Sequence, residues 1–341
     1  MKPLLLFLIL TIHPALLFFF FTLNLGILIT ISSSSWFGCW LGLELNLISF
    51  VPLLTSKYDT YSSEAALKYF LIQALGSATI LIRVSCNFLN AHSINLIIFI
   101  ALLLKSGAAP LHFWFPPVIQ GIKFTQCIIL ITLQKIAPIT IISYTLHIER
   151  IWLPLFLTSI LSRVVGALGG LNQTLIRKII AYSSINHIAW MLAAISISTS
   201  LWGFYFIIYS IVTTTVMLLF YSQQILHIKQ VVNTTIESPF VKVALFFNLI
   251  SLGGLPPFLG FVPKALLINV LTLNRQFIWL SVLLFRALIT LFFYLRLSLT
   301  AFTIVSHKTK LSQHMHTKRF MILTLVNLFP LVRPLLLLPP Y

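Results

Sequence analysis

Long apolar runs separated by short polar or Gly- and Pro-containing segments make up most of the chain. The runs exceed 18 residues, enough for a helix to cross a bilayer, and they lack the alternation of a membrane β-barrel strand. Within lipid the backbone must satisfy its own hydrogen bonds, which leaves helices. The pattern therefore predicts an all-α, polytopic membrane protein with about eleven transmembrane helices, at 4–31, 36–54, 63–88, 94–114, 122–146, 151–171, 174–196, 201–226, 240–271, 277–303 and 320–338.

Two of these runs carry Gly and Pro at the same spacing, so each is predicted to be a broken helix. The motifs are Gly107-x-x-Pro110-x5-Pro116 and Gly254-x-x-Pro257-x5-Pro263. They lie five spans apart, and because five is odd the two copies cross the membrane in opposite directions. Two inverted five-helix repeats with broken helices are typical of an antiporter-like fold. We expect a single membrane domain over 1–341, with approximate repeats 1–150 and 151–303 and a final helix at 320–338.

The composition agrees with a membrane protein. Only 8% of the residues are charged, against roughly 25% in a soluble domain. The net charge of +17 comes from 22 Lys and Arg against five acids. These bases are scattered, apart from a basic run at 306–319, so no nucleic-acid partner is expected. The three cysteines lie in separate apolar segments without a C-x-x-C pair, which argues against a disulfide framework or a metal site in this chain.

Basic residues are unequally divided between the predicted loops. With eleven spans, the N-terminus and the even-numbered loops share one side. Eleven basic residues lie on that side and two to four on the other. The positive-inside rule therefore predicts an N-terminus on the inner side. Residues 4–31 are apolar for longer than a signal-peptide core, so we expect no cleaved leader.

Four ionisable residues lie deep in predicted spans or beside a predicted break: Glu44, Lys105, Lys135 and Lys264. A charge at the bilayer centre costs at least about 2.5–3.5 kcal/mol, so such residues normally face protein or water and pair with one another. Burial and a second cation both disfavour the charged form of a lysine, which lets it gain and lose protons near neutral pH. We interpret these four residues as a proton relay.

The alternative is that such residues form structural ion pairs, or that their long side chains extend to the membrane surface and place the charge in water. That suits Lys68, Arg83 and Arg296, which lie near span ends. Ser63 and Glu64 predict the start of the third span, and Glu64 lies one turn before Lys68.

Two histidines are candidates for the relay. His112 and His187 could each bridge lysines through water, or each could be a hydrogen-bonded packing residue. The chain has no Gly-rich nucleotide loop after a strand and no paired histidines at haem spacing. We therefore expect no cofactor-binding site and no metal site in this chain.

Six stretches of the chain carry a family resemblance. They are Trp36–Phe50 (WFGCWLGLELNLISF), Ser63–Gln73 (SEAALKYFLIQ), Lys105–Pro116 (KSGAAPLHFWFP), Leu133–Pro138 (LQKIAP), Gly169–His187 (GGLNQTLIRKIIAYSSINH) and Ser251–Lys264 (SLGGLPPFLGFVPK). In these stretches the sequence resembles the chain 2 family of mitochondrial NADH:ubiquinone oxidoreductase, respiratory complex I. The resemblance implies an eleven-helix animal form with a glutamate in the second helix and lysines along the central axis. Glu44, Lys105, Lys135 and Lys264 match those positions.

The resemblance also implies a function. The chain would be an antiporter-like subunit that translocates protons, with Glu44 and Lys105 as a coupled pair, Lys135 as central relay and Lys264 handing the proton towards the exit. NADH, FMN, the iron–sulfur clusters and ubiquinone would bind other subunits. Partners would be other membrane subunits, among them the antiporter-like chain 4 and small membrane chains, and lipids such as cardiolipin. The location would be the mitochondrial inner membrane, with the N-terminus on the matrix side.

Two other functions stay open, namely a stand-alone cation/proton antiporter and a structural membrane subunit that does not pump. Three arginines also depart from the family pattern: Arg163 and Arg286 lie deep in spans where the family has uncharged residues, and Arg83 departs in a similar way. They would contact lipid headgroups or a neighbouring chain, or they would be serines, since some mitochondrial codes assign AGA and AGG to serine.

Overall fold

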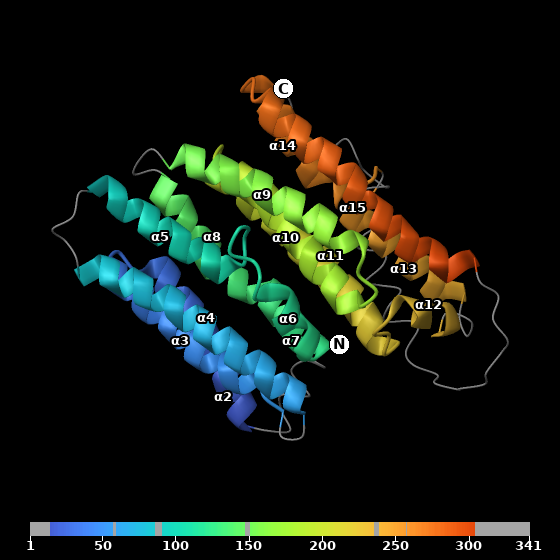
Figure 1. Cartoon of the computed structure of the whole chain (residues 1–341), viewed down its shortest axis with the longest axis horizontal. Helices are drawn as coiled ribbons and strands as arrows, with labels where there is room; N and C mark the ends of the chain where they lie inside the picture. Colours follow the sequence, from blue (N-terminus) through green and yellow to red (C-terminus); the bar gives the residue numbers. More distant parts are fainter. Residues whose placement is uncertain are drawn as a thin grey trace. The chain divides into compact units, whose positions relative to one another are not determined.

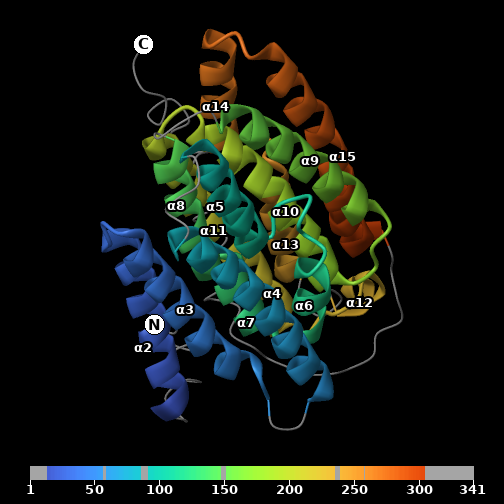
Figure 2. The same ribbon diagram turned by 60° about the vertical axis from the view of Figure 1, so that its left-hand side comes forward.

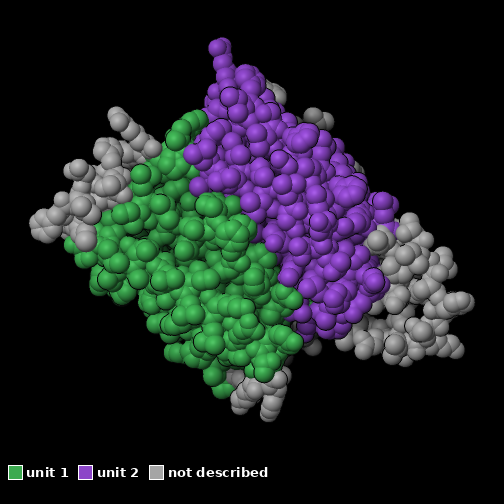
Figure 3. Space-filling view, in the orientation of Figure 1, with its two compact units in different colours: residues 1–155 green, residues 156–341 purple. Residues whose placement is uncertain are grey.

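The structure, a computed structural model, describes residues 14–56, 59–85, 91–146, 151–234, 239–256 and 258–303, and it is all-helical there apart from one isolated backbone bridge between Leu175 and His227. The all-α prediction is therefore confirmed for these ranges. The predicted helix 320–338, the basic run 306–319 and Pro257 lie outside the described residues. The chain divides into two compact units, Met1–Leu155 and Phe156–Tyr341, coloured in Figure 3.

In its described residues, unit 1 contains seven helices that lie wholly within it: α2 (Pro14–Ser32), α3 (Trp36–Leu54), α4 (Thr60–Ser85), α5 (Ala91–Ser106), α6 (Phe115–Gly121), α7 (Phe124–Ile131) and α8 (Leu133–Leu146). Helix α3 packs between α2 and α4, and α4 packs against α5 and α6 (Figure 1). Helix α8 contacts both α2 and α5, so it crosses the interior of this unit.

Two glycines let α2 and α3 approach closely. A Cβ atom at Gly26 would lie 2.9 Å from the backbone of Asn46, and one at Gly42 would lie 2.6 Å from the side chain of Thr30. Helix α3 begins at a serine cap, where the Ser35 hydroxyl accepts the Gly38 N–H at 3.2 Å. The close contact fixes α3, and with it the buried polar residue Asn46, against the rest of the unit.

The start of α4 differs from the prediction. The helix begins at Thr60 rather than near Ser63, because the Asp59 carboxylate accepts the N–H of Tyr61 at 3.2 Å and supplies the cap. The predicted contact one turn further is confirmed, since the Lys68 ammonium lies 2.5 Å from Glu64 Oε1 on the exposed face.

The other described helices belong to unit 2, apart from the first turn of α9, which precedes Phe156. They are α9 (Trp152–Leu171), α10 (Ile176–Ile195), α11 (Thr199–Ser222), α12 (Ile228–Thr234), α13 (Pro239–Gly253), α14 (Phe261–Leu273) and α15 (Phe277–Thr303). Helix α10 is buried along almost its whole length and packs on α11, while α11 and α15 both contact α13 and α14 (Figure 2). The polar residues of α10, which include Ser183, Asn186 and His187, therefore lie inside the unit.

Seven segments in the described ranges are long and apolar enough to cross a membrane: Pro14–Ser32, Trp36–Leu54, Thr60–Ser85, Phe124–Leu146, Trp152–Leu171, Thr199–Ser222 and Phe277–Leu299. The predicted fourth and ninth spans are divided into shorter helices, as expected. Helix α5 is followed by a loop and α6, and α13 is followed by a loop and α14. Both predicted breaks are thus confirmed. The fifth span is also interrupted, between α7 and α8, which was not predicted.

Candidate functional site

The break after α5 is a glycine-terminated helix end. Gly107 has φ +74°, a conformation that glycine adopts without steric cost. The Ala108 N–H donates to the Leu103 carbonyl at 3.1 Å, and the Gly107 N–H donates to the Leu104 carbonyl at 3.3 Å. These two bonds are the Schellman motif, which stops a helix and turns the chain away.

The break after α13 repeats this geometry. Gly254 has φ +76°, the Leu255 N–H donates to the Ile250 carbonyl at 3.5 Å, and the Gly254 N–H donates to the Ser251 carbonyl at 3.0 Å. The same glycine and the same pair of bonds therefore end the broken helix in both units. This common geometry supports the internal repeat that the motif spacing predicts.

Carbonyl groups at the two helix ends also accept hydrogen bonds from side chains, and the donors differ between the two units. In unit 1 the acceptors are the carbonyls of Lys105 and Leu104. The side-chain amide of Gln73 donates to the Lys105 carbonyl at 3.2 Å, and the indole N–H of Trp114 donates to the Leu104 carbonyl at 3.0 Å. Both donors are neutral, so the end of α5 is satisfied without a charge.

In unit 2 a cation bonds to the carbonyls at the helix end, one of which, that of Leu252, is equivalent to the Lys105 carbonyl of unit 1. The Lys264 ammonium donates to the carbonyl of Gly253 at 2.7 Å and to that of Leu252 at 3.3 Å. A helix C-terminus carries a partial negative charge, so an ammonium is well placed there. Lys264 is only 7% exposed, and the structure thus places it at the second break, as the sequence indicates.

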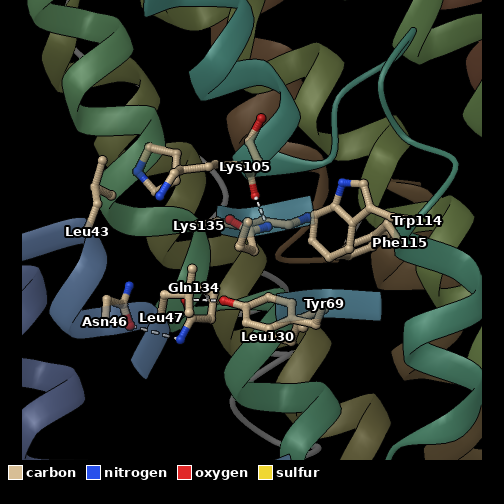
Figure 4. A pocket seen from close by; sticks show the side chains of 13 residues that line it. Leu43, Asn46, Leu47, Tyr69, Lys105, Trp114, Phe115, Leu130, Gln134 and Lys135 are labelled. Atoms are coloured by element: carbon tan, nitrogen blue, oxygen red, sulfur yellow. Dashed lines mark hydrogen bonds between the residues drawn. The ribbon is translucent and has the colours of Figure 1, made fainter. Parts of the chain in front are cut away.

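Lys105 and Lys135 line one pocket inside unit 1, which Figure 4 shows from close by. Their residues are 6% and 1% exposed. Lys105 comes from the last turn of α5 and Lys135 from the first turn of α8, where its ammonium lies 5.0 Å from the centre of the Phe115 ring. Ser106 and Trp114 bring the pocket up to the break itself.

A chain of neutral hydrogen bonds forms the opposite wall of this pocket. The Tyr69 hydroxyl donates to Gln134 Oε1 at 3.1 Å, and the Gln134 amide donates to Asn46 Oδ1 at 2.9 Å, as the dashed lines in Figure 4 show. These bonds join α4, α8 and α3. The space is water-sized and has several polar walls, the conditions under which buried water is held.

The interruption between α7 and α8 lies just before Lys135. Thr132 has φ −107° and ψ −79°, and its hydroxyl donates to the Ile128 carbonyl at 2.6 Å beside the backbone bond from its own N–H to the same carbonyl at 3.0 Å. Pro138, one turn after Lys135, has no N–H to donate to the Gln134 carbonyl. The backbone is therefore irregular on both sides of Lys135, and Thr132 with Pro138 is the sequence signal from which this irregularity could have been predicted.

Glu44 is only half-buried, and no ion pair within 4.0 Å joins it to Lys105 in the described part of the chain. Glu44 and Lys105 are expected to lie within direct or water-bridged reach, and the direct form is not present in this structure. The Oε2 atom of Glu44 is buried without a hydrogen-bond partner. A pair bridged by water stays a prediction.

The two candidate histidines have different surroundings. His112 lies in the loop after α5, where its Nδ1 is 3.2 Å from the Pro110 carbonyl and its ring packs on Phe113, and it does not line the pocket of Lys105 and Lys135. His187 lies on α10, and its Nδ1 is 2.9 Å from the hydroxyl of Tyr205. It lines a second pocket, in unit 2.

Arg163 is 1% exposed and bonded inside unit 2. Its guanidinium donates to the Leu283 carbonyl at 3.1 Å and to Asn186 Oδ1, and it lies 5.0 Å from the centre of the Trp190 ring. The hypothesis that it contacts lipid headgroups or a neighbouring chain is therefore wrong for this residue. Arg83 and Arg286 are half-buried, and the Arg286 guanidinium lies 6.0 Å from the Phe285 ring.

No group of three His, Cys, Asp or Glu side chains in the described ranges is placed to hold a metal ion. Several residues that shape the unit 1 pocket were not among the predicted site residues, namely Asn46, Tyr69, Gln73, Trp114 and Gln134. They are neutral, so they did not stand out by charge. A polar amide inside an apolar run is nevertheless unusual, and that signal could have identified Asn46, Gln73 and Gln134.

The model of the family described as "NADH:quinone oxidoreductase/Mrp antiporter, TM" matches residues 33–95 and 82–290 of the chain. NADH-ubiquinone oxidoreductase chain 2 of Anopheles gambiae is 46% identical over 293 residues, which cover 83% of this chain and 85% of the relative. The chain belongs to the NADH-ubiquinone oxidoreductase chain 2 family. This finding confirms the family resemblance that the six sequence stretches indicated.

Solved structures show the same fold. A chain of respiratory complex I from Thermus thermophilus aligns with a TM-score of 0.83 and 24% identity, covering 95% of this chain and 79% of the other. A chain of the membrane-bound sulfane sulfur reductase, an archaeal respiratory membrane complex, aligns with a TM-score of 0.80 and 19% identity, covering 93% and 72%. The antiporter-like architecture predicted for this chain 2 family member is confirmed.

Proposed function

We propose that this chain is a proton-translocating membrane subunit of NADH:ubiquinone oxidoreductase. The observation that carries the proposal is the pocket of unit 1, in which two lysines line one water-sized, polar space beside a broken helix. Membership of the chain 2 family and the likeness to respiratory complexes support it. Oxidation of NADH and reduction of ubiquinone would take place in other subunits, which would hold FMN and the iron–sulfur clusters.

Because Lys105 and Lys135 line one pocket, the protonation of one would affect the protonation of the other. Two ammonium groups in one small buried space repel each other, so a proton on one disfavours a proton on the other. A negative charge on Glu44 would stabilise the ammonium form of Lys105, and any change that moves Glu44 away would release the proton towards Lys135. Water held by Gln134, Tyr69 and the adjacent amides would carry the proton across the pocket.

Lys264 would do the corresponding work in unit 2. When protonated, it is stabilised by two charge-assisted bonds to the end of α13. When it releases its proton, those bonds weaken and the helix end loses its cation. Proton transfer at Lys264 would in this way change the conformation of the break.

The rival functions are weighed by what each requires. A stand-alone cation/proton antiporter would share the broken helices, but the relatives are chain 2 proteins rather than single-chain antiporters. A structural subunit would not need three lysines that are 1–7% exposed. We further propose the mitochondrial inner membrane as the location, with the N-terminus and 304–319 on the matrix side. Other membrane subunits, including chain 4, and cardiolipin would be partners.

The test is Lys105→Met in the intact complex, with Lys68→Met as the matched control on the exposed face of α4. Methionine fills a similar volume without the charge, so we expect the complex to assemble and pumping to fall by about 100-fold or more, the scale of a lost proton-transfer group. NADH-driven pH changes in vesicles and NADH:ubiquinone activity report the outcome. A Lys105→Met complex that pumps as well as the control contradicts the proposal.

A further inference from the structure

Unit 2 contains a pocket between α10, α11 and the broken helix. Its walls include His187, Tyr205, Tyr209, Ser251 and Leu252. Leu252 is one of the two residues whose carbonyls bond to the Lys264 ammonium. The pocket therefore extends from the imidazole of His187 to the end of α13, where a cation is held.

The orientation of His187 is determined by groups on α11. The Tyr205 hydroxyl lies 2.9 Å from His187 Nδ1, and the ring of Tyr209, one turn later on the same helix face, lies 4.8 Å from the imidazole centroid. Tyr205 is 2% exposed, so water does not replace this bond. On the α10 side, Arg163 holds the neighbouring residue Asn186.

This hydrogen bond decides what the imidazole can do. If the tyrosine O–H donates to Nδ1, the neutral ring carries its proton on Nε2; if the Nδ1–H donates to the tyrosine oxygen, Nε2 is the unprotonated ring nitrogen. In either case Nδ1 is bonded to Tyr205, so proton exchange by this ring would take place at Nε2. A hydrogen bond to one ring nitrogen sets the tautomer and the role of the other.

We propose that Tyr205 is a positioning residue that makes His187 a proton-transfer group between this pocket and the broken helix that carries Lys264. The inference rests on the proposed function, because it assigns a role within the same relay. It goes further in naming which ring nitrogen exchanges protons and which side chain holds the ring for that purpose.

The experiment is a double-mutant cycle in the intact complex with Tyr205→Phe, His187→Gln and both together. Phenylalanine keeps the buried ring and removes only the hydroxyl. At metal sites, loss of a second partner that orients a histidine costs about 10–100-fold, so we expect about a tenfold fall in protons pumped per NADH oxidised. In the His187→Gln background the same change should have no further effect, because its effect passes through the imidazole. Tyr221→Phe on the same helix is the control and should pump normally.

A packing role for Tyr205 would give losses that add in the double variant, and additive losses overturn the inference. Normal pumping by Tyr205→Phe while His187→Gln is impaired also overturns it. If His187→Gln and Tyr205→Phe both pump normally but Lys105→Met does not, the inference fails and the proposed function stands. If Lys105→Met also pumps normally, the proposed function fails as well. Assembly of each variant is checked by its NADH oxidation with an artificial acceptor.

Discussion

The two broken helices have the same backbone but different chemistry. Each ends at a glycine with φ near +75° and closes with the same two hydrogen bonds. In unit 1 the neutral side chains of Gln73 and Trp114 donate to carbonyls at the helix end, whereas in unit 2 the Lys264 ammonium does so. The glycine therefore sets where each helix stops, and we expect the side-chain donor to decide whether the helix end responds to a proton.

The cations also lie on opposite sides of the two breaks. The motifs are offset by 254 − 107 = 147 positions, so Lys105 corresponds to Leu252, and Lys264 corresponds to Pro117. Unit 1 thus carries its cation before the break and adds Lys135 from α8, while unit 2 carries its cation after the break. The two breaks thus share a backbone geometry and differ in where the charge lies.

The largest effect should come from removing the cation at the second break. Lys264→Met loses both the proton-transfer group and the donor to Leu252 and Gly253, so we expect pumping to fall by about 100-fold or more. The lost charge-assisted bonds should also cost about 2–3 kcal/mol of stability. Pumping assays and thermal inactivation of the complex measure the two effects separately. Lys229→Met, on α12 outside the break, is the control, and equal behaviour of the two variants would remove the distinction between the breaks.

Matched substitutions of the two glycines should separate backbone from charge. In both Gly107→Ala and Gly254→Ala the positive φ should cost about 1–2 kcal/mol. The new Cβ at 254 would lie 2.5 Å from the Lys264 ammonium, whereas the one at 107 would lie 3.2 Å from the Phe115 ring. We expect similar losses of thermal stability but a loss of pumping that is severalfold greater for Gly254→Ala. Equal pumping by the two variants would show that the position of the ammonium does not matter.

Sequence reasoning located the features that depend on residue type alone. Gly and Pro at fixed spacing predicted the breaks, and charge in an apolar run predicted the depth of Lys105, Lys135 and Lys264. It did not predict features that depend on which groups meet in space. His112 bonds within its own loop, and Glu44 forms no direct pair with Lys105, because both outcomes follow from how the helices pack rather than from position along the chain.

The hydrogen bonds made by neutral side chains could not be predicted from the sequence for the same reason. Gln73 and Trp114 are on different elements from the carbonyls to which they donate, and Tyr69, Gln134 and Asn46 come from three helices. No spacing along the chain brings them together. The irregular backbone at Thr132 could be predicted only in part. A hydroxyl residue six positions before Pro138 indicates that the helix is interrupted, but it does not say at which residue.

The smallest effect should come from the neutral donor at the first break. Trp114→Phe removes the indole N–H that bonds to the Leu104 carbonyl but keeps an aromatic ring beside Tyr69 and Phe115. Loss of one neutral hydrogen bond and some ring area should cost about 1–2 kcal/mol of stability. Pumping per NADH should stay near normal, because no proton is held at this position. Trp152→Phe, on the exposed side of α9, controls for the change of ring. If Trp114→Phe abolished pumping in an assembled complex, the end of α5 would be as critical for proton transfer as that of α13, and the contrast between a neutral and a charged helix end would not hold.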